Sequence, residues 1–210
     1  MGRRWQLERK RDHFYRMAKS EGYRSRAAFK LKQLDERYHL LAAGQVVVDL
    51  GAAPGGWLQV ARERVGDGGF VLGVDLQAIA KLPYENVTTL VADITDASTP
   101  ELIRAKLPRP ADVLLSDASP DISGIWDVDH ARSMELAEAA LAIADAALAP
   151  GGKLLLKVFQ GEMFEELLSK VKQRFNSVKV TKPAASRKRS AEVYIVAEGF
   201  RKSRWPVPSP

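Results

Sequence analysis

Apolar runs of strand length alternate with helical patterns along most of the chain, and this alternation constrains the fold more than any other feature. Several runs are almost entirely apolar, as expected for strands that are covered on both faces. Strands separated by helices predict an α/β fold with a parallel, doubly wound sheet. The expected strands are Gln45–Leu50, Phe70–Leu76, Val87–Ala92, Val113–Ser116, Lys153–Phe159, Val178–Thr181 and Val193–Ala197, and the expected helices span about Ser25–Tyr38, Gly56–Val65, Pro100–Leu107, Asp129–Leu148 and Gly161–Phe175.

The end of the chain departs from strict alternation. Lys182–Ala191 is too short to hold a crossover helix, so the last two strands are expected to form an antiparallel hairpin. Two local signals delimit helices: Ser25 is the expected N-cap of the first helix, and Pro150-Gly151-Gly152 is a strong stop after the fourth.

Length and composition exclude several classes of protein. The 210 residues, 46% of them hydrophobic, are consistent with one domain. The chain has no cysteine, which excludes a disulfide framework, a thiolate metal site and a cysteine nucleophile. The three histidines have no metal-ligand spacing, and no metal is expected. Since no apolar stretch approaches the roughly 20 residues of a membrane span, the expected location is the cytoplasm.

Charge is segregated along the chain. Residues 1–40 hold 12 Lys and Arg against 5 Asp and Glu, residues 41–178 hold 12 against 19, and residues 179–210 hold 8 against 2. Two basic ends suggest contact with a polyanion such as nucleic acid, although solvated basic tails are the alternative. We divide the chain into a basic RNA-contacting segment (1–24), a catalytic domain (25–200) and a flexible tail (201–210). Aromatic residues interleave with the N-terminal charges and either stack on bases or pack against the domain: Trp5, Phe14, Tyr15 and Tyr23.

A glycine-rich turn follows the first core strand, in the segment Asp49–Trp57 (DLGAAPGGW). Doubly wound folds bind nucleotides at this position, but the loop lacks GxGxxG spacing, which disfavours a nicotinamide dehydrogenase. Asp75 ends the next strand, where a carboxylate commonly accepts from ribose hydroxyls, and Asp93 ends the third, where it would accept from an adenine amino group. An adenosine site without a phosphate cradle fits S-adenosylmethionine best.

Five segments in this order resemble the FtsJ family of RNA ribose 2′-O-methyltransferases: GYRSRAAFKL (22–31), VVDLGAAPGGW (47–57), LLSDASPDISG (114–124), LAPGGKLLLKVFQG (148–161) and SRKRSAEVYIVA (186–197). The resemblance covers nearly the whole chain. It implies a class I, Rossmann-like methyltransferase fold and a Lys-Asp-Lys-Glu catalytic tetrad, which falls on Lys30, Asp117, Lys157 and Glu192. It also implies that S-adenosylmethionine is held by the glycine loop and three carboxylates, at Gly51, Ala52, Pro54, Gly55, Gly56, Trp57, Asp75, Asp93 and Asp117.

Methyl transfer to a ribose hydroxyl requires alignment of the groups and a base near the hydroxyl. A lysine serves as that base only where burial or a nearby cation favours its neutral form. Lys157 lies within an apolar run, and our hypothesis is that it takes the 2′-OH proton with Lys30 as the nearby positive charge. Asp117 is expected to orient Lys157, and Glu192 to position Lys30 or the ribose.

The substrate is expected to be RNA, because a 2′-OH distinguishes RNA from DNA. Within the family, the short chain is most similar to enzymes that modify a uridine in the A loop of large-subunit (23S) ribosomal RNA. Relatives that act on the tRNA anticodon loop and on RNA caps share the motifs, so these substrates remain alternatives. A different class of function is also an alternative: an RNA-binding assembly protein that does not transfer methyl groups. Lys188 and Arg189 are candidate phosphate contacts, and a monomer is the default expectation.

Overall fold

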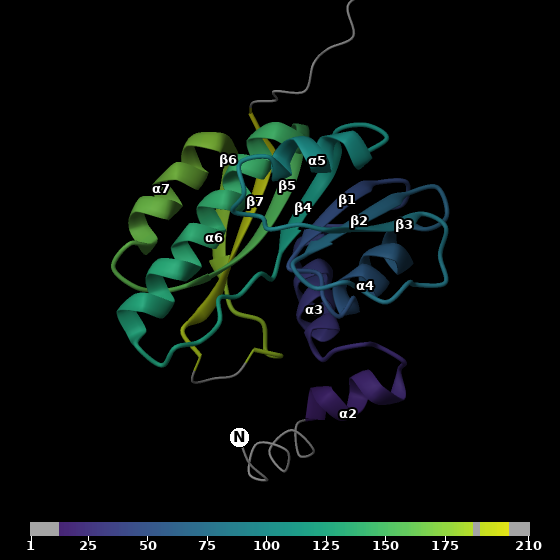
Figure 1. Cartoon of the computed structure of the whole chain (residues 1–210), viewed down its shortest axis with the longest axis horizontal. Coiled ribbons are helices and arrows are strands. Elements are labelled where there is room, and N and C mark those ends of the chain that lie inside the picture. Colours follow the sequence, from purple (N-terminus) through teal and green to yellow (C-terminus); the bar gives the residue numbers. More distant parts are fainter. Residues whose placement is uncertain (1–12, 187–189, 202–210) are drawn as a thin grey trace, which may run out of the picture.

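The computed structural model describes residues 13–186 and 190–201 of the chain. They form one seven-stranded sheet in the order β3-β2-β1-β4-β5-β7-β6 (Figure 1). In chain order the elements are α2 (His13–Ser20), α3 (Ala27–Tyr38), β1 (Val46–Leu50), α4 (Gly56–Val65), β2 (Phe70–Asp75), β3 (Val87–Val91), α5 (Thr99–Lys106), β4 (Ala111–Ser116), α6 (Trp126–Ala147), β5 (Leu148–Phe159), α7 (Phe164–Arg174), β6 (Phe175–Thr181) and β7 (Glu192–Phe200).

The sheet is parallel except at one strand. β1 pairs in parallel with β2 and β4, whereas β7 is antiparallel to both β5 and β6. The predicted α/β class and the antiparallel hairpin of β6 and β7 are therefore confirmed. The parallel strands all end at the same edge of the sheet, and α2 lies on that side of the molecule (Figure 1).

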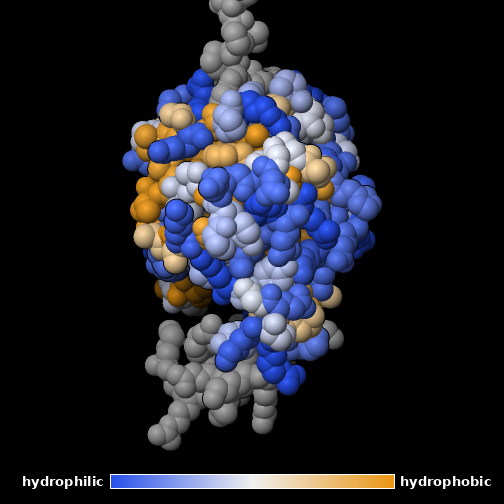
Figure 2. Space-filling model, turned by 90° about the vertical axis from the view of Figure 1, so that its right-hand side faces the viewer, coloured by the Kyte–Doolittle hydropathy of each residue, from blue (hydrophilic) through white to orange (hydrophobic). Residues whose placement is uncertain are grey.

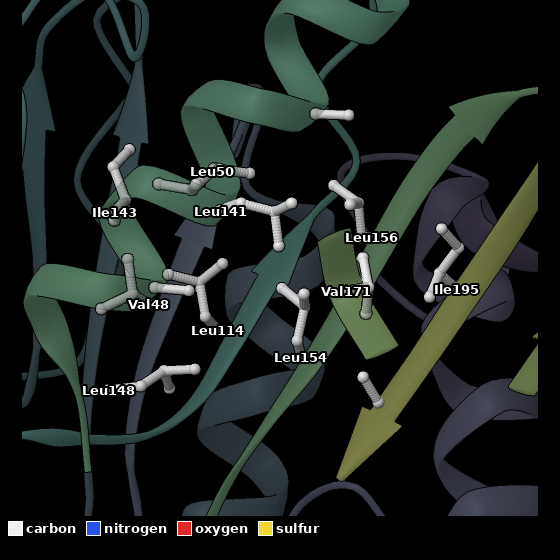
Figure 3. Packing of buried hydrophobic residues seen from close by; sticks show 14 of the residues in the cluster. Val48, Leu50, Leu114, Leu141, Ile143, Leu148, Leu154, Leu156, Val171 and Ile195 are labelled. Carbon is white, nitrogen blue, oxygen red and sulfur yellow. The ribbon is translucent and has the colours of Figure 1, made fainter. Parts of the chain in front are cut away.

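Helices cover both faces of the sheet and bury two hydrophobic cores. The larger core packs side chains of the sheet against α5, α6 and α7, and the smaller packs the opposite face against α3 and α4. Every residue of β1 is buried, as the apolar run predicts for a strand that is covered on both sides. Figure 3 shows the larger core, where side chains from four strands, among them Leu114 and Ile195, point toward those of α6 and α7.

One face of the molecule is mostly polar. Figure 2 shows that the right-hand side of the molecule in Figure 1 is largely hydrophilic, with apolar residues gathered toward one margin of that view. In the part of the chain that the structure describes, no helix is both long and apolar enough to cross a membrane.

Two local predictions are wrong. Ser25 does not cap the first helix: α3 begins at Ala27 with Arg26 at the N-cap and no side-chain cap. Ser25 packs instead against Gly56. Strand β5 begins at Leu148, not Lys153, and therefore includes the Pro-Gly-Gly sequence. The register of β4 and β5 shifts between Ala111 and Val113, and such an irregularity accommodates residues that a regular ladder excludes.

Helix α2 was not predicted, because it has only eight residues, HFYRMAKS, and lies in a strongly basic stretch of the chain. Its apolar residues Phe14, Met17 and Ala18 have helical spacing and pack together with Phe29 of α3 and Ala185. The rings of Phe14 and Tyr23 lie 5.7 and 5.9 Å from that of Phe29, so both aromatic residues pack against the domain. Trp5, Lys188, Arg189 and the tail from residue 202 lie outside the described residues.

Removal of a buried leucine tests the core. Leu114 is fully buried, so Leu114→Ala is expected to lower the free energy of unfolding by about 2–5 kcal/mol through lost burial and a residual cavity. The measurement is denaturant unfolding. Leu102→Ala is the control, since Leu102 is exposed on α5 and its truncation should change stability by less than about 0.5 kcal/mol. Equal effects at the two positions would contradict this assignment of the core.

Candidate active site

Four charged side chains from distant parts of the chain meet near the ends of the central strands. Lys30 Nζ of α3 lies 2.8 Å from Glu192 Oε1 at the start of β7 and 3.9 Å from Asp117 Oδ1, just after β4. Lys157 Nζ of β5 lies 3.2 Å from Asp117 Oδ1 and donates to the Asp117 backbone carbonyl at 2.6 Å. The structure thus brings together all four residues of the predicted tetrad, as two linked lysine–carboxylate pairs.

The four side chains are largely withdrawn from water. The side chain of Lys157 is 6% exposed, and those of Lys30, Glu192 and Asp117 are 12–16% exposed. Burial alone would raise the pKa of Asp117, but the ammonium groups of Lys157 and Lys30 and a hydrogen bond from Tyr194 hold it below its usual value. Asp117 is therefore a stable anion that fixes the position of Lys157.

Two further polar groups complete this cluster, and neither was predicted from the sequence. The Tyr194 hydroxyl donates to Asp117 Oδ1 at 2.7 Å, and Ser186 Oγ donates to Glu192 Oε1 at 2.8 Å. Lys30 Nζ also lies 5.7 Å from the centre of the Tyr194 ring. Tyr194 sits opposite Lys157 in the β5–β7 register, so the antiparallel pairing of these strands sets both groups beside Asp117.

Loss of the Tyr194 hydroxyl tests its contribution. Burial and the neighbouring carboxylates Asp117 and Glu192 raise the pKa of Tyr194 well above its ordinary value, so the phenol remains a donor at working pH. Tyr194→Phe is expected to lower methyl transfer about 10- to 150-fold, because a hydrogen bond to a charged group contributes about 1.5–3 kcal/mol. Single-turnover rates would measure this. The control Tyr38→Phe, at the half-buried last residue of α3 and outside the contacts of the tetrad, should leave the rate unchanged; a wild-type rate for Tyr194→Phe would contradict the role.

The glycine loop between β1 and α4 folds tightly against the strand end that carries Asp117. Gly51 has φ +72°, and a Cβ at this position would lie 2.5 Å from Cα of Ala118. Gly55 has φ +106°, and Gly56 is packed against Ser25. Glycine is favoured at Gly51 and Gly55 because both have a left-handed backbone conformation. The remaining predicted loop residues are Ala52, which is buried, and Pro54, which is exposed and follows a cis peptide bond.

The predicted strand-end carboxylates occupy different environments. Asp75 accepts hydrogen bonds from the backbone N–H groups of Ala53 and Gln77, at 2.9 and 2.8 Å, and so joins the end of β2 to the glycine loop. Asp93 is exposed and accepts from the backbone and side chain of Thr95.

A third carboxylate, Asp49 in β1, is fully buried, and neither of its oxygens has a hydrogen-bond partner among the described residues. Its strand pairs with β2, which ends at Asp75, and with β4, which leads to Asp117. Burial, reinforced by Asp117 and Asp75, raises the pKa of Asp49 well above its usual value. An unpaired buried carboxyl is costly, so this arrangement suits a ligand that carries positive charge.

Trp57, a predicted donor-binding residue, is part of the framework of the site. Its side chain is 3% exposed, its Nε1 donates to the Ala27 carbonyl at 2.7 Å, and its ring lies 6.2 Å from that of Tyr194. The indole thus connects the start of α4 to α3 and β7. Among residues 13–186 and 190–201, no cluster of His, Asp and Glu side chains has the arrangement of a metal site.

The chain is similar to known proteins over most of its length. The model of the FtsJ-like methyltransferase family matches residues 23–200, which include every element except α2. The chain is 50% identical to a protein named ribosomal RNA large subunit methyltransferase E from Methanothermobacter thermautotrophicus, over 98% of each chain. It is 56% identical to a protein of the same name from Methanothrix thermoacetophila, over 90% of this chain and 72% of that protein.

Solved structures share the fold. A ribosomal RNA methyltransferase from Plasmodium falciparum matches with a TM-score of 0.75 and 29% identity, over 86% of this chain and all of that chain. An rRNA methylase from Clostridium thermocellum matches with a TM-score of 0.55 and 16% identity, over 82% of this chain and 97% of that chain, and carries information on the fold alone.

Proposed function

Since the chain belongs to the FtsJ-like methyltransferase family, we propose that it transfers a methyl group from S-adenosylmethionine to a ribose 2′-hydroxyl of RNA, with Lys157 as the general base. The proposed target is a uridine in the A loop of large-subunit (23S) ribosomal RNA. The relatives named as large-subunit ribosomal RNA methyltransferases support the choice of RNA class.

One observation carries the proposal: two lysines are held on one buried aspartate beside the glycine loop. Lys157 Nζ is fixed by the carboxylate and the carbonyl of Asp117, while Lys30 Nζ is paired with Glu192. In the proposed step the amine of Lys157, which has first lost a proton to solvent, takes the proton of the ribose hydroxyl. As that O–H bond breaks, the oxygen bonds to the methyl carbon and the carbon–sulfur bond breaks, with the neutral thioether as the leaving group. Lys30 supplies a second positive charge at the site, held on Glu192 and 3.9 Å from the same Asp117 oxygen that Lys157 contacts.

The other residues of the cluster position these two lysines. Asp117 holds Lys157 and receives the Tyr194 hydroxyl on the same oxygen, Oδ1. Glu192 holds Lys30 and is itself held by Ser186. Fixed positions matter because displacement at the methyl carbon requires the ribose oxygen, that carbon and the leaving sulfur to lie in line.

Residues at the strand ends fit an adenosine-containing cation. The buried, unpartnered Asp49 suits a positive charge, and the glycine loop permits close approach of the backbone. Asp75 would accept from ribose hydroxyls, and the exposed Leu76 beside it offers apolar surface to adenine. Asp93, Gly55 and Trp57 complete the proposed set. When bound, S-adenosylmethionine supplies a methyl group activated by a positively charged sulfur.

The segregation of charge supports an RNA substrate. Both ends of the chain are basic while the middle is acidic, and Lys and Arg contacts to phosphates provide much of the affinity for nucleic acid. We expect one copy of the chain to suffice, because all four residues of the tetrad come from a single copy.

The proposal is tested by transfer of labelled methyl from S-adenosylmethionine to three RNA preparations: unmethylated large ribosomal subunits, free ribosomal RNA and bulk unmodified tRNA. The modified nucleotide is then mapped. We expect label on large-subunit RNA, at the 2′-oxygen of one uridine. Label on tRNA alone would retain the chemistry and replace the substrate. Donor binding without label on any RNA would favour an RNA-binding assembly protein.

A further inference from the structure

A large aromatic side chain lies exposed beside the proposed tetrad. Trp126, the first residue of α6, is 48% exposed, and the preceding loop exposes Ile122 and Ile125 by 64% and 61%. None of these three residues takes part in the contacts of the tetrad, and none belongs to the hydrophobic cores. Exposed apolar side chains that gather in one short segment indicate an interaction surface.

The plane of the Trp126 ring is set by two neighbouring rings. The indole is inclined by only 12° to the imidazole of His130, at 5.7 Å between centres, and by 20° to the ring of Phe159, at 6.3 Å. His130 is 5% exposed, and its Nε2 accepts from the Met163 backbone N–H at 3.2 Å. A Cβ at Gly161 would lie 2.7 Å from the imidazole, so glycine is required for His130 to occupy this place.

The loop before Trp126 is also held in place. The Asp129 carboxylate accepts hydrogen bonds from the backbone N–H groups of Ser123 and Gly124 and from the Ser123 hydroxyl, at 2.7, 3.1 and 2.7 Å. Arg132 donates to the Asp121 carbonyl at 3.3 Å. The exposed side chains of this loop are therefore presented by an ordered backbone, which lowers the entropy lost on binding.

Strand register places the Trp126 ring within reach of a nucleotide bound at the tetrad. Phe159, which contacts Trp126, pairs directly with Glu192 in the β5–β7 ladder. Phe159 also lies on the same face of β5 as Lys157, two residues and about 7 Å further along the strand. The Trp126 ring centre lies a further 6.3 Å from that of Phe159, so a base one or a few nucleotides from a ribose at Lys157 can come near Trp126.

We propose that Trp126 stacks on a nucleobase of the RNA beside the ribose that receives the methyl group. This inference rests on the proposed function, since it takes RNA as the substrate. The flat, fixed and half-exposed indole matches the way in which unpaired bases bind proteins. We call this indole the stacking platform. In the segment that carries it, the exposed carboxylates of Asp121 and Asp127 outnumber the one exposed cation, Arg132, and this balance favours a base over a phosphate.

Three variants of Trp126 test the proposal by two measurements. Trp126→Phe keeps an aromatic ring, Trp126→Leu keeps apolar bulk without one, and Trp126→Ala removes both; Leu102→Ala is the matched exposed control. Filter binding of protein-free large-subunit RNA is measured without donor, and KM and kcat are measured with donor on the same RNA and on intact subunits. We expect Trp126→Ala and Trp126→Leu to weaken RNA binding and raise KM about 5- to 150-fold, with kcat within about threefold. Trp126→Phe and Leu102→Ala should stay within about threefold of wild type.

The outcomes distinguish failure of the stacking platform from failure of the proposed function. Normal transfer and unchanged RNA binding in Trp126→Leu, which should retain the packing, would overturn the platform and leave the proposed function intact. RNA binding that depends on Trp126 without methyl transfer by the wild type would support the platform and overturn the proposed function. A defect on intact subunits but not on free RNA would assign the surface to a ribosomal protein and overturn the base-stacking proposal.

Discussion

Lys157→Met is expected to lower methyl transfer about 100- to 10,000-fold, the range contributed by a positioned general base, while donor and RNA binding stay within about threefold of wild type. Methionine has similar length and suits an apolar strand, so the fold should persist. The change removes the amine that receives the 2′-OH proton in the proposed step. It leaves Asp117 paired with Lys30 at 3.9 Å and with Tyr194 at 2.7 Å. Single-turnover transfer separates this chemical effect from changes in binding.

Lys153→Met is the matched control for this prediction. Lys153 lies on the same strand and the same face of β5, four residues before Lys157, and donates to the His39 carbonyl away from the tetrad. Its replacement should leave single-turnover transfer within about twofold of wild type. Equal losses for the two variants would show that the loss of any lysine from this strand impairs transfer. Wild-type transfer by Lys157→Met would show that Lys157 is not the general base.

Strand identity was predictable wherever a strand is buried on both faces. The segment of β1 is apolar except for Asp49, as expected for a buried strand, and the alternation of such strands with helices predicts a parallel sheet. Helix α2 was not predictable in this way, because it has only eight residues and its apolar face consists of Phe14, Met17 and Ala18. One contact partner of that face, Ala185, lies far along the chain, and tertiary packing stabilises short helices more than propensity does.

The tetrad was predicted from motifs, whereas its supporting residues depend on strand pairing. Tyr194 lies in an apolar run that reads as core, and it is indeed fully buried. Its role depends on the register that sets it opposite Lys157, which sequence periodicity does not specify across a sheet. The stacking of Trp126 on His130 and Phe159 is likewise a consequence of tertiary packing. The one available signal was that Tyr194 comes two residues after Glu192, a spacing that puts both side chains on the same face of a strand.

Asp49→Asn is expected to affect stability and donor binding in opposite directions. In the free protein, burial raises the pKa of Asp49 and makes its ionised form unfavourable, and a neutral amide of the same shape avoids that cost. With the donor bound, the carboxylate becomes the counter-charge for a cation, and an interaction of this kind is worth about 2 kcal/mol or more. The variant should therefore unfold at higher temperature at pH 7 and bind S-adenosylmethionine at least about 30-fold more weakly.

The raised pKa of Asp49 also predicts how the stability difference between Asp49→Asn and wild type changes with pH. Because the pKa of Asp49 is higher in the folded than in the unfolded chain, its contribution to stability is fully present below the unfolded value of about 3.9 and is lost as pH rises through the folded value. The stability advantage of Asp49→Asn over wild type should thus be small near pH 4 and increase toward neutral pH. Thermal unfolding and calorimetric titration with S-adenosylmethionine measure the two effects, with Asp67→Asn as an exposed control. A variant that loses stability at every pH, or binds the donor as tightly as wild type does, would show that Asp49 serves the fold and not the donor.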